Sequence, residues 1–232
     1  MDISGRILFE DNHLIVINKL PGELTQGDKT GDGTLQDDVK EYLKVKYEKK
    51  GNVYLGSPHR LDRPTSGAIL YTKTEKALIR MSAAFRTSDV KKTYWAIVDN
   101  LPEKEEGELV HYLLRDTVTN KSKAFSKEVP SSKFARLKYK VIAKGERYAL
   151  LEIDLMTGRH HQIRAQLNAI GVHIKGDLKY GARRSNPDGG IALHARKLSF
   201  THPVRKEMVE ITAPVPDDSL WKYFEEIASR DV

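Results

Sequence analysis

Short apolar runs and amphipathic stretches alternate along the chain. Two runs typical of strands, residues 7–10 and 14–18, flank Asp11-Asn12, a pair typical of turns. Further strand patterns cover residues 68–71, 93–99, 135–143, 148–155, 193–200 and 207–213. Helical spacing of apolar residues predicts helices over residues 34–50, 75–87, 160–171 and 220–229. Many strands with a few interspersed helices predict an α+β fold with a mixed, largely antiparallel sheet and flanking helices.

The first predicted helix has recognisable end signals. Thr34 is a suitable N-cap, with Asp37 three residues later as its partner in a capping box. Gly51 is a typical residue after a helix end, so the pattern predicts a helix that continues to Lys50. Its polar face is expected to be solvated surface.

Composition narrows the class of protein. A length of 232 residues suits one large domain or two small ones, and without a compositional boundary or repeat we expect a single domain, 1–232. The absence of cysteine excludes disulfides and thiolate metal sites. The N-terminal residues do not resemble a signal peptide and no apolar run approaches a membrane span, so we expect a cytoplasmic protein without a membrane partner. The net charge of +7 favours a polyanionic partner.

The segment HRLDRPTSG, residues 59–67, is the first candidate for chemistry. Asp62 lies between Arg60 and Arg63 in a stretch that proline and glycine predict to be a turn. Positive neighbours favour the ionised carboxylate, which can act as a nucleophile or as a base. The alternative is a surface turn in which Asp62 merely pairs with Arg63.

A second candidate, residues 156–164, runs from a strand end into a helix. Ile163 and Leu167 form an inward face, and Arg164 is expected to reach a buried edge, where an arginine usually has a carboxylate partner. The alternative is a surface helix with scattered charges. Adjacent helical residues point about 100° apart, so we expect His160 and His161 not to share a metal ion.

Motifs for nucleotide, nicotinamide or zinc chemistry are missing. The sequence contains no GxxxxGK[ST], GxGxxG, HExxH or GxSxG pattern, so we expect no cofactor. Tyr94 lies on a predicted strand, where a tyrosine can belong to the core or stack on a base.

Together these segments resemble the RluA-type family of RNA pseudouridine synthases. The resemblance covers almost the whole chain and rests on the segments ILFEDNHLIVINKLPG, HRLDRPTSG, KKTYWAIV, TGRHHQIRAQL, GDLKYG and LHARKLSFTHP, in that order. HRLDRPTSG is the most specific of them. Leu20 between Lys19 and Pro21 departs from the family pattern, in which proline directly follows lysine. The family often carries an N-terminal S4-type domain, and this chain begins almost directly at the first motif.

The resemblance implies roles for individual residues. Asp62 matches the essential catalytic aspartate, Tyr94 the tyrosine that stacks on the target base, and Arg164 the arginine that pairs with the aspartate. Arg60 matches the arginine that enters the space left by the flipped nucleotide. Leu193 matches an apolar residue of the base pocket. The remaining predicted RNA- or base-binding residues lie in the same motifs: Arg63, Arg159, His161 and Gln162.

The implied fold has a central RNA-binding cleft, and the implied activity is conversion of a uridine to pseudouridine in ribosomal or transfer RNA. Whether the aspartate attacks C1′ or removes a proton from C2′ stays open. Residues 25–33 and 180–190, including Arg183 and Arg184, are candidates for selecting the RNA. Nothing indicates an obligate dimer, so a monomer is expected.

Two other functions remain possible at this point. A non-catalytic RNA-binding protein would share the charge but would not need Asp62, Tyr94 and Arg164 together. A nucleosidase or glycosidase also acts at C1′, but it normally uses a second carboxylate, and none lies near either motif.

Overall fold

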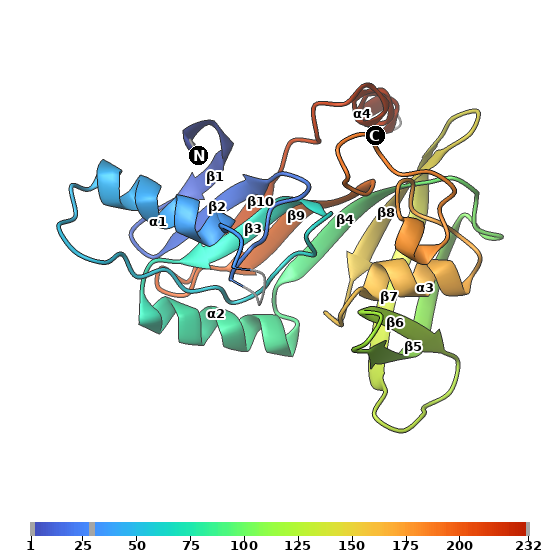
Figure 1. The fold of residues 1–232 in the computed structure, drawn as a ribbon, viewed down its shortest axis with the longest axis horizontal. Coiled ribbons are helices and arrows are strands. Elements are labelled where there is room, and N and C mark those ends of the chain that lie inside the picture. The colour runs from blue at the N-terminus through green and yellow to red at the C-terminus, as the bar shows by residue number, and fades with distance from the viewer. Residues whose placement is uncertain (1–2, 28–30, 231–232) are drawn as a thin grey trace. The chain divides into compact units, whose positions relative to one another are not determined.

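The computed structural model describes residues 3–27 and 31–230, which form two compact units. The first unit comprises Met1–Lys91 and Ala195–Pro214, and the second comprises Lys92–His194 and Val215–Val232. Figure 1 shows the elements of each. The prediction of one domain over residues 1–232 stays a prediction beside this division. None of the helices in the described residues has the length and apolarity that a bilayer span requires.

The first unit is a sheet covered by helices. Its strands follow the order β1-β2-β3-β9, with β10 paired to β9. The pairs β1–β2, β2–β3 and β9–β10 are antiparallel. The bounds are β1 Ile7–Glu10, β2 Leu14–Lys19, β3 Ser66–Thr72, β9 Leu193–Thr201, β10 Met208–Thr212, α1 Leu35–Lys46 and α2 Glu75–Thr87, with a short 3-10 helix at Ser4–Arg6.

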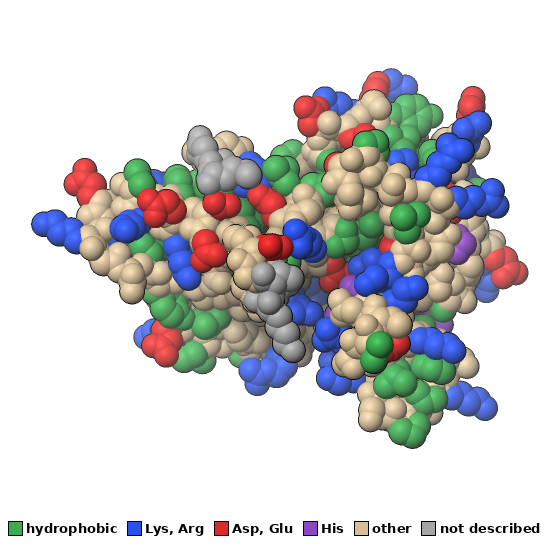
Figure 2. Space-filling model, in the orientation of Figure 1, with side chains coloured by type: hydrophobic (Ala, Val, Ile, Leu, Met, Phe, Trp, Pro, Cys, Tyr) green, Lys and Arg blue, Asp and Glu red, His purple; other side chains and the backbone are tan. Residues whose placement is uncertain are grey.

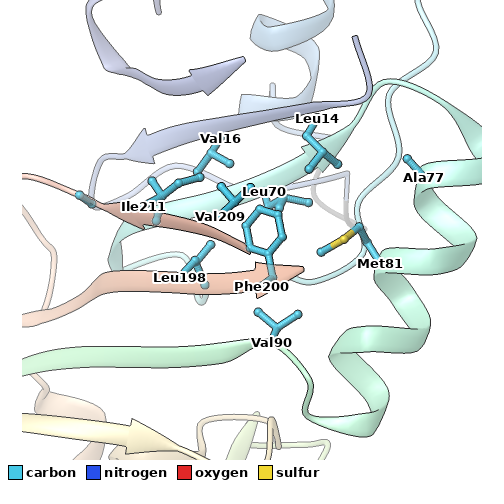
Figure 3. Packing of buried hydrophobic residues seen from close by; sticks show 12 residues of the cluster. Leu14, Val16, Leu70, Ala77, Met81, Val90, Leu198, Phe200, Val209 and Ile211 are labelled. Atoms are coloured by element: carbon cyan, nitrogen blue, oxygen red, sulfur yellow. The ribbon is translucent and has the colours of Figure 1, made fainter. Parts of the chain in front are cut away.

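A hydrophobic cluster joins α2 to this sheet (Figure 3). The strands contribute apolar side chains that are almost completely buried, and α2 adds Ala77 and Met81 from one face. This helix begins at the N-cap Thr74, whose hydroxyl accepts the Ala77 N–H, and ends at Ser88 in a left-handed conformation. The predicted amphipathic face of residues 75–87 is therefore the face that builds the core.

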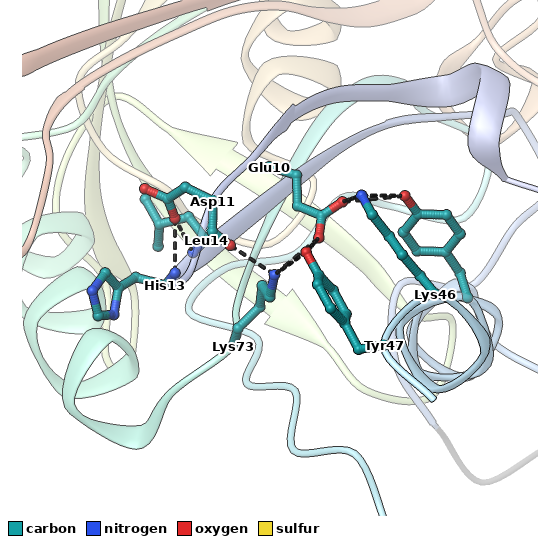
Figure 4. A network of polar contacts seen from close by, with 8 residues as sticks. Glu10, Asp11, His13, Leu14, Lys46, Tyr47 and Lys73 are labelled. Carbon is teal, nitrogen blue, oxygen red and sulfur yellow. Dashed lines mark hydrogen bonds and ion pairs between the residues drawn. The ribbon is translucent and has the colours of Figure 1, made fainter. Parts of the chain in front are cut away.

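The first helix confirms its predicted start but not its predicted end. Thr34 and Asp37 form the expected capping box. The helix ends at Lys46, whereas the apolar pattern predicted Lys50, and Glu48 has a positive φ of 47°. Lys46 and Tyr47, at this end of the helix, donate hydrogen bonds to Glu10, which also accepts one from Lys73 after β3 (Figure 4). Although burial alone raises the pKa of Glu10, these bonds lower it to about 2.

The second unit has the strand order β4-β8-β7-β5-β6, and all four neighbouring pairs are antiparallel. The bounds are β4 Lys91–Val98, β5 Glu106–Asp116, β6 Lys121–Phe125, β7 Lys133–Lys144, β8 Ala149–Leu155, α3 Gln162–Ala169 and α4 Ser219–Arg230, with a 3-10 helix at Leu178–Tyr180. In Figure 1, α3 lies against β5 and β6. The α+β class and the largely antiparallel sheet are confirmed.

Candidate active site

The loop that carries Asp62 is tightly held within the first unit. The Asp62 carbonyl accepts the Thr65 N–H at 3.0 Å and closes a turn directly before β3. His59, at the start of the loop, accepts the Leu70 N–H through Nε2 at 2.9 Å and stacks on the Phe85 ring at 4.2 Å. The Asp62 side chain is half-buried. A half-buried carboxylate on an anchored turn combines a fixed position with access to a ligand.

Lys19, at the end of β2, holds this loop through hydrogen bonds to its backbone. Its completely buried ammonium donates to three carbonyls: Leu20 at 2.9 Å, Arg63 at 2.9 Å and Thr65 at 2.6 Å. Burial lowers the pKa of Lys19 to about 8, while the negative charges of Glu23 and Asp62 act in the opposite direction. Lys19 therefore fixes the backbone that directly follows Asp62 and places positive charge near its carboxylate.

The two predicted arginines of this loop are both exposed. Arg63 donates through Nε to the Gly22 carbonyl at 3.0 Å and through Nη1 to Asp32 at 3.1 Å. Arg63 and Asp32 thus form an ion pair. Residues 28–30 of the predicted RNA-selecting loop lie outside the described residues.

Tyr94 lies on β4 in the second unit, opposite Ile153 of β8, and is 8% exposed. Lys92 occupies the same strand face two residues earlier and is equally buried. Burial lowers the pKa of Lys92, and its Nζ lies beside Gly158. This face of β4 thus carries an aromatic ring and, two residues earlier, an amine that lies next to Gly158.

Arg164 is buried, on a helix that is itself almost wholly buried. Residues 162–167 of α3 are all buried, so the alternative of a surface helix with scattered charges is wrong. The guanidinium of Arg164 makes two hydrogen bonds to Asp177, from Nε at 2.7 Å and from Nη2 at 2.8 Å. Arg164 is 5% exposed and Asp177 is 1% exposed. The predicted carboxylate partner of a buried arginine is therefore present in the second unit, and it holds the guanidinium in one orientation.

The two histidines before α3 have separate hydroxyl partners. His161 has a left-handed φ of 52° and precedes the helix, so the expected 100° divergence of helical neighbours does not apply: the rings of His160 and His161 stack at 3.8 Å. His160 Nδ1 lies 2.9 Å from the Ser122 hydroxyl, and His161 Nδ1 lies 3.0 Å from the Tyr180 hydroxyl. Burial, with the charge of Arg164 adding to it, lowers the pKa of His161 to about 2, so this ring is neutral.

Gln162 holds the backbone that precedes the helix. Its carbonyl oxygen accepts from the Thr157 hydroxyl at 2.8 Å and from the Arg159 N–H at 3.0 Å, and its amide donates to the Arg136 carbonyl at 3.1 Å. Arg159 itself is exposed and donates to the Phe134 carbonyl at 2.9 Å. Leu193, the first residue of β9, is 4% exposed.

A family model described as RNA pseudouridylate synthase matches residues 13–169. This interval is more than half of the chain and contains Asp62, Tyr94 and Arg164. The chain belongs to the RNA pseudouridylate synthase family. It is accordingly an RNA pseudouridine synthase, an isomerase that converts uridine to pseudouridine within RNA.

Curated relatives agree with this assignment. The chain is 34% identical over 215 residues to the uncharacterized RNA pseudouridine synthase YhcT of Bacillus subtilis, covering 91% of this chain and 69% of the relative. It is 32% identical over 227 residues to ribosomal large subunit pseudouridine synthase D of Zymomonas mobilis, covering 94% and 71%. It is 30% identical over 220 residues to ribosomal large subunit pseudouridine synthase C of Vibrio parahaemolyticus, covering 92% and 67%.

Solved structures show the fold of the synthase. Human RNA pseudouridylate synthase domain containing 4 superposes with a TM-score of 0.78 at 24% identity, over 98% of this chain and 93% of that one. Human RNA pseudouridylate synthase domain containing 1 gives 0.72 at 23% identity, over 93% and 85%. The predicted pseudouridine synthase fold is confirmed.

The predicted site residues of the synthase divide between the two units. Asp62 belongs to the first unit with Arg60 and Arg63, whereas Tyr94 and Arg164 belong to the second. Their meeting around one uridine, in a central cleft, stays a prediction. Within the second unit the structure also places Arg159, His161, Gln162 and Leu193; Leu193 and His194 begin β9, and its remaining residues belong to the first unit.

Sequence reasoning missed three residues that organise the synthase around these positions. Lys19 ends an apolar strand, where a lysine is ordinarily exposed, so the pattern along the chain gave no signal of its burial. Asp177 and Tyr180 lie in the segment GDLKYG, for which the sequence predicted no individual roles. The requirement of buried Arg164 for a carboxylate was recognised, but its partner lies 13 residues away, beyond the reach of helical spacing.

Proposed function

We propose that Asp62 is the catalytic carboxylate of this pseudouridine synthase. In the reaction the N1–C1′ bond of a uridine breaks, the uracil turns, and a C5–C1′ bond forms. C5 then loses its proton and N1 gains one, so atoms and charge balance without a redox partner. The protein must supply one positioned carboxylate near C1′, a face for the detached uracil and a route to the base.

The geometry of the loop carries the proposal. A carboxylate can act at C1′ only if it is ionised and held in place, and Asp62 lies on a turn closed by its own carbonyl and by Lys19. The buried Lys19 ammonium lies close enough to Asp62 for their opposite charges to attract. Since the side chain is half-buried, a flipped nucleotide can approach it from solvent.

Tyr94 and Arg164 are proposed to complete the site from the second unit. Tyr94 offers an aromatic face on a rigid strand, which suits stacking on a uracil ring. Arg164 is prepared for a fixed role because Asp177 orients its guanidinium. Arg60, which is exposed, is proposed to fill the gap left in the RNA by the flipped nucleotide, and Leu193 to line the base pocket.

Ribosomal RNA is the proposed substrate. Two relatives at 30% and 32% identity are named ribosomal large subunit pseudouridine synthases. Transfer RNA is the alternative polymer, since the isomerisation chemistry is the same in both. A cytoplasmic, monomeric enzyme is part of the same proposal.

The decisive experiment maps pseudouridine by carbodiimide treatment and primer extension on unmodified ribosomal RNA and pooled transfer RNA. We expect a new stop with the wild-type protein and none with Asp62→Asn. The matched control is Glu41→Gln, an acid-to-amide change at an exposed position of α1, which should leave the stop unchanged.

Binding of the same RNA should change less than fivefold in Asp62→Asn, because the substitution is nearly isosteric. A stop that persists in Asp62→Asn would refute the assignment of Asp62. Release of free uracil in place of a rearranged base would indicate a hydrolase and would refute the isomerisation at this site.

A further inference from the structure

Three aromatic side chains stand side by side across three strands of the second unit. Tyr112 of β5 is paired in register with Phe125 of β6 on one side and with Phe134 of β7 on the other. The Tyr112 and Phe134 rings meet edge to face, with centroids 5.9 Å apart. These three residues are called the aromatic row.

The aromatic row lies on the sheet face that α3 leaves uncovered. Side chains alternate along a strand, and Leu113, next to Tyr112, packs with Ala135 and Ala165 in the cluster beneath α3. Tyr112 therefore points to the opposite face, as does Phe134, which precedes Ala135. Phe134 is 43% exposed, and Tyr112 and Phe125 are half-buried. Exposed aromatic side chains that adjoin one another typically mark an interaction site.

Positive charge surrounds the aromatic row. Lys123 Nζ lies 5.2 Å from the centroid of the Phe125 ring. At the other end, Arg159, a predicted RNA-binding residue, donates to the Phe134 carbonyl at 2.9 Å. On the side that carries α3, which Figure 2 shows, Lys and Arg side chains also lie over this part of the second unit. The row thus extends from a segment predicted to contact the substrate.

A hollow of about 680 Å³ lies between the edge strand β6 and α3, on the α3 side of the sheet, and reaches the aromatic row only at Phe125. Phe125 contributes to its wall, and so do four cationic residues: Arg115, Lys121, Lys123 and Lys179. Its single acidic residue, Asp116, accepts hydrogen bonds from the Val118 N–H and the Thr119 hydroxyl of its own turn. Side chains alternate along β6, so Lys121 and Lys123 share the face of Phe125 and place positive charge beside the rings. Cations beside exposed rings are complementary to a phosphate backbone whose bases turn toward the rings.

We propose that the aromatic row is a stacking platform for unpaired bases of the substrate RNA, with the phosphates following Lys121 and Lys123 along the edge strand β6. Sheet faces bind single-stranded RNA in this way, because an aromatic ring stacks on any base and neighbouring lysines neutralise phosphates. The proposal rests on the proposed function for its ligand. It adds a second contact, on nucleotides outside the target uridine.

The test measures binding of a fluorescein-labelled 12-nucleotide RNA without self-pairing by fluorescence anisotropy. In the double variant Phe125→Leu/Phe134→Leu, which keeps apolar volume but removes two ring faces, we expect Kd to rise at least about tenfold. Phe125→Tyr/Phe134→Tyr should restore binding to within about twofold. The matched control, Val110→Ala, changes an apolar side chain that is 46% exposed on the same face of β5 and should bind as the wild type does.

Salt dependence separates stacking from charge. The leucine variant should keep the wild-type slope of log Kd against log salt, whereas Lys121→Gln/Lys123→Gln should lower its magnitude by about 1.4, from roughly 0.7 for each lost phosphate contact. Wild-type affinity in the leucine variant, with unchanged circular dichroism, would overturn the proposal. So would a concentration-dependent dimer of the wild type that the leucine variant abolishes, because the row would then join two copies.

Turnover measurements distinguish a failure of the aromatic-row proposal from a failure of the proposed catalytic function. At saturating RNA the leucine variant should form pseudouridine at the wild-type rate, with a raised KM only. Persistent turnover in Asp62→Asn would refute the catalytic role of Asp62 and leave the binding result for the aromatic row untouched.

Discussion

The buried pair of Arg164 and Asp177 makes a prediction whose magnitude follows from its geometry. Both side chains are nearly inaccessible and share two hydrogen bonds below 3 Å. Asp177→Asn leaves a guanidinium buried without its carboxylate, and Arg164→Met leaves a carboxylate buried without its cation. Breaking a buried pair from one side costs about 3–5 kcal/mol, so each single variant should lose that much of the free energy of unfolding.

The double variant Arg164→Met/Asp177→Asn removes both charges and should lose less than the sum of the two single losses. We expect a coupling energy of about 2 kcal/mol or more. Urea unfolding monitored by tryptophan fluorescence suits this measurement, because Trp95 and Trp221 both lie in the second unit with the pair.

An exposed pair of the same unit supplies the control. Arg230 and Glu226 form an ion pair with side chains 71% and 66% exposed, and the same cycle on them should give a coupling below about 0.5 kcal/mol. Additive losses for Arg164 and Asp177, within about 0.5 kcal/mol, would refute the reasoning. The pair would then contribute to stability no more than the exposed one.

Three further predictions concern the loop of Asp62 and the start of α3. Lys19→Met removes the donor that bonds to three backbone carbonyls and should lower the free energy of unfolding by about 2–4 kcal/mol. Chemical denaturation measures this loss, with Lys44→Met at an exposed position as the control. Equal stability of the two variants would contradict the prediction. Gly67 has a φ of 110°, and a Cβ there would lie 2.4 Å from the Ala195 carbonyl oxygen. Gly67→Ala should therefore lower the melting temperature by several degrees. An unchanged melting temperature would show that the chain does not come this close to Gly67. The pKa of His161 is lowered to about 2, so below pH 6.5 this ring binds a proton in the unfolded chain but not in the folded protein. The free energy of unfolding therefore decreases as the pH is lowered, by on the order of 1 kcal/mol per pH unit. His161→Gln should flatten this dependence between pH 6 and pH 4 in denaturation curves, and an identical slope would contradict it.

Local patterns predicted most of the elements because periodicity is a local property. The predicted strands and the helix over residues 75–87 appear within one or two residues of their expected bounds, and the capping box at Thr34 formed as expected. The helix that Thr34 begins is shorter than its pattern, because Tyr47 bonds to Glu10, a residue of a distant strand. The sequence did not predict β5 and β6 as separate strands, because apolar and polar residues alternate only weakly along this hairpin.

The sequence by itself determined the family of the synthase and the chemistry to expect, because residues 59–67 and 156–164 bring the required residue types into continuous segments. Tertiary structure alone decided the partners. Asp177 reaches Arg164 across 13 residues, and Lys19 bonds to carbonyls up to 46 residues away. The aromatic row likewise exists only through the register of β6, β5 and β7. Burial and pairing depend on chain segments that meet only after folding, so no periodicity along the chain encodes them.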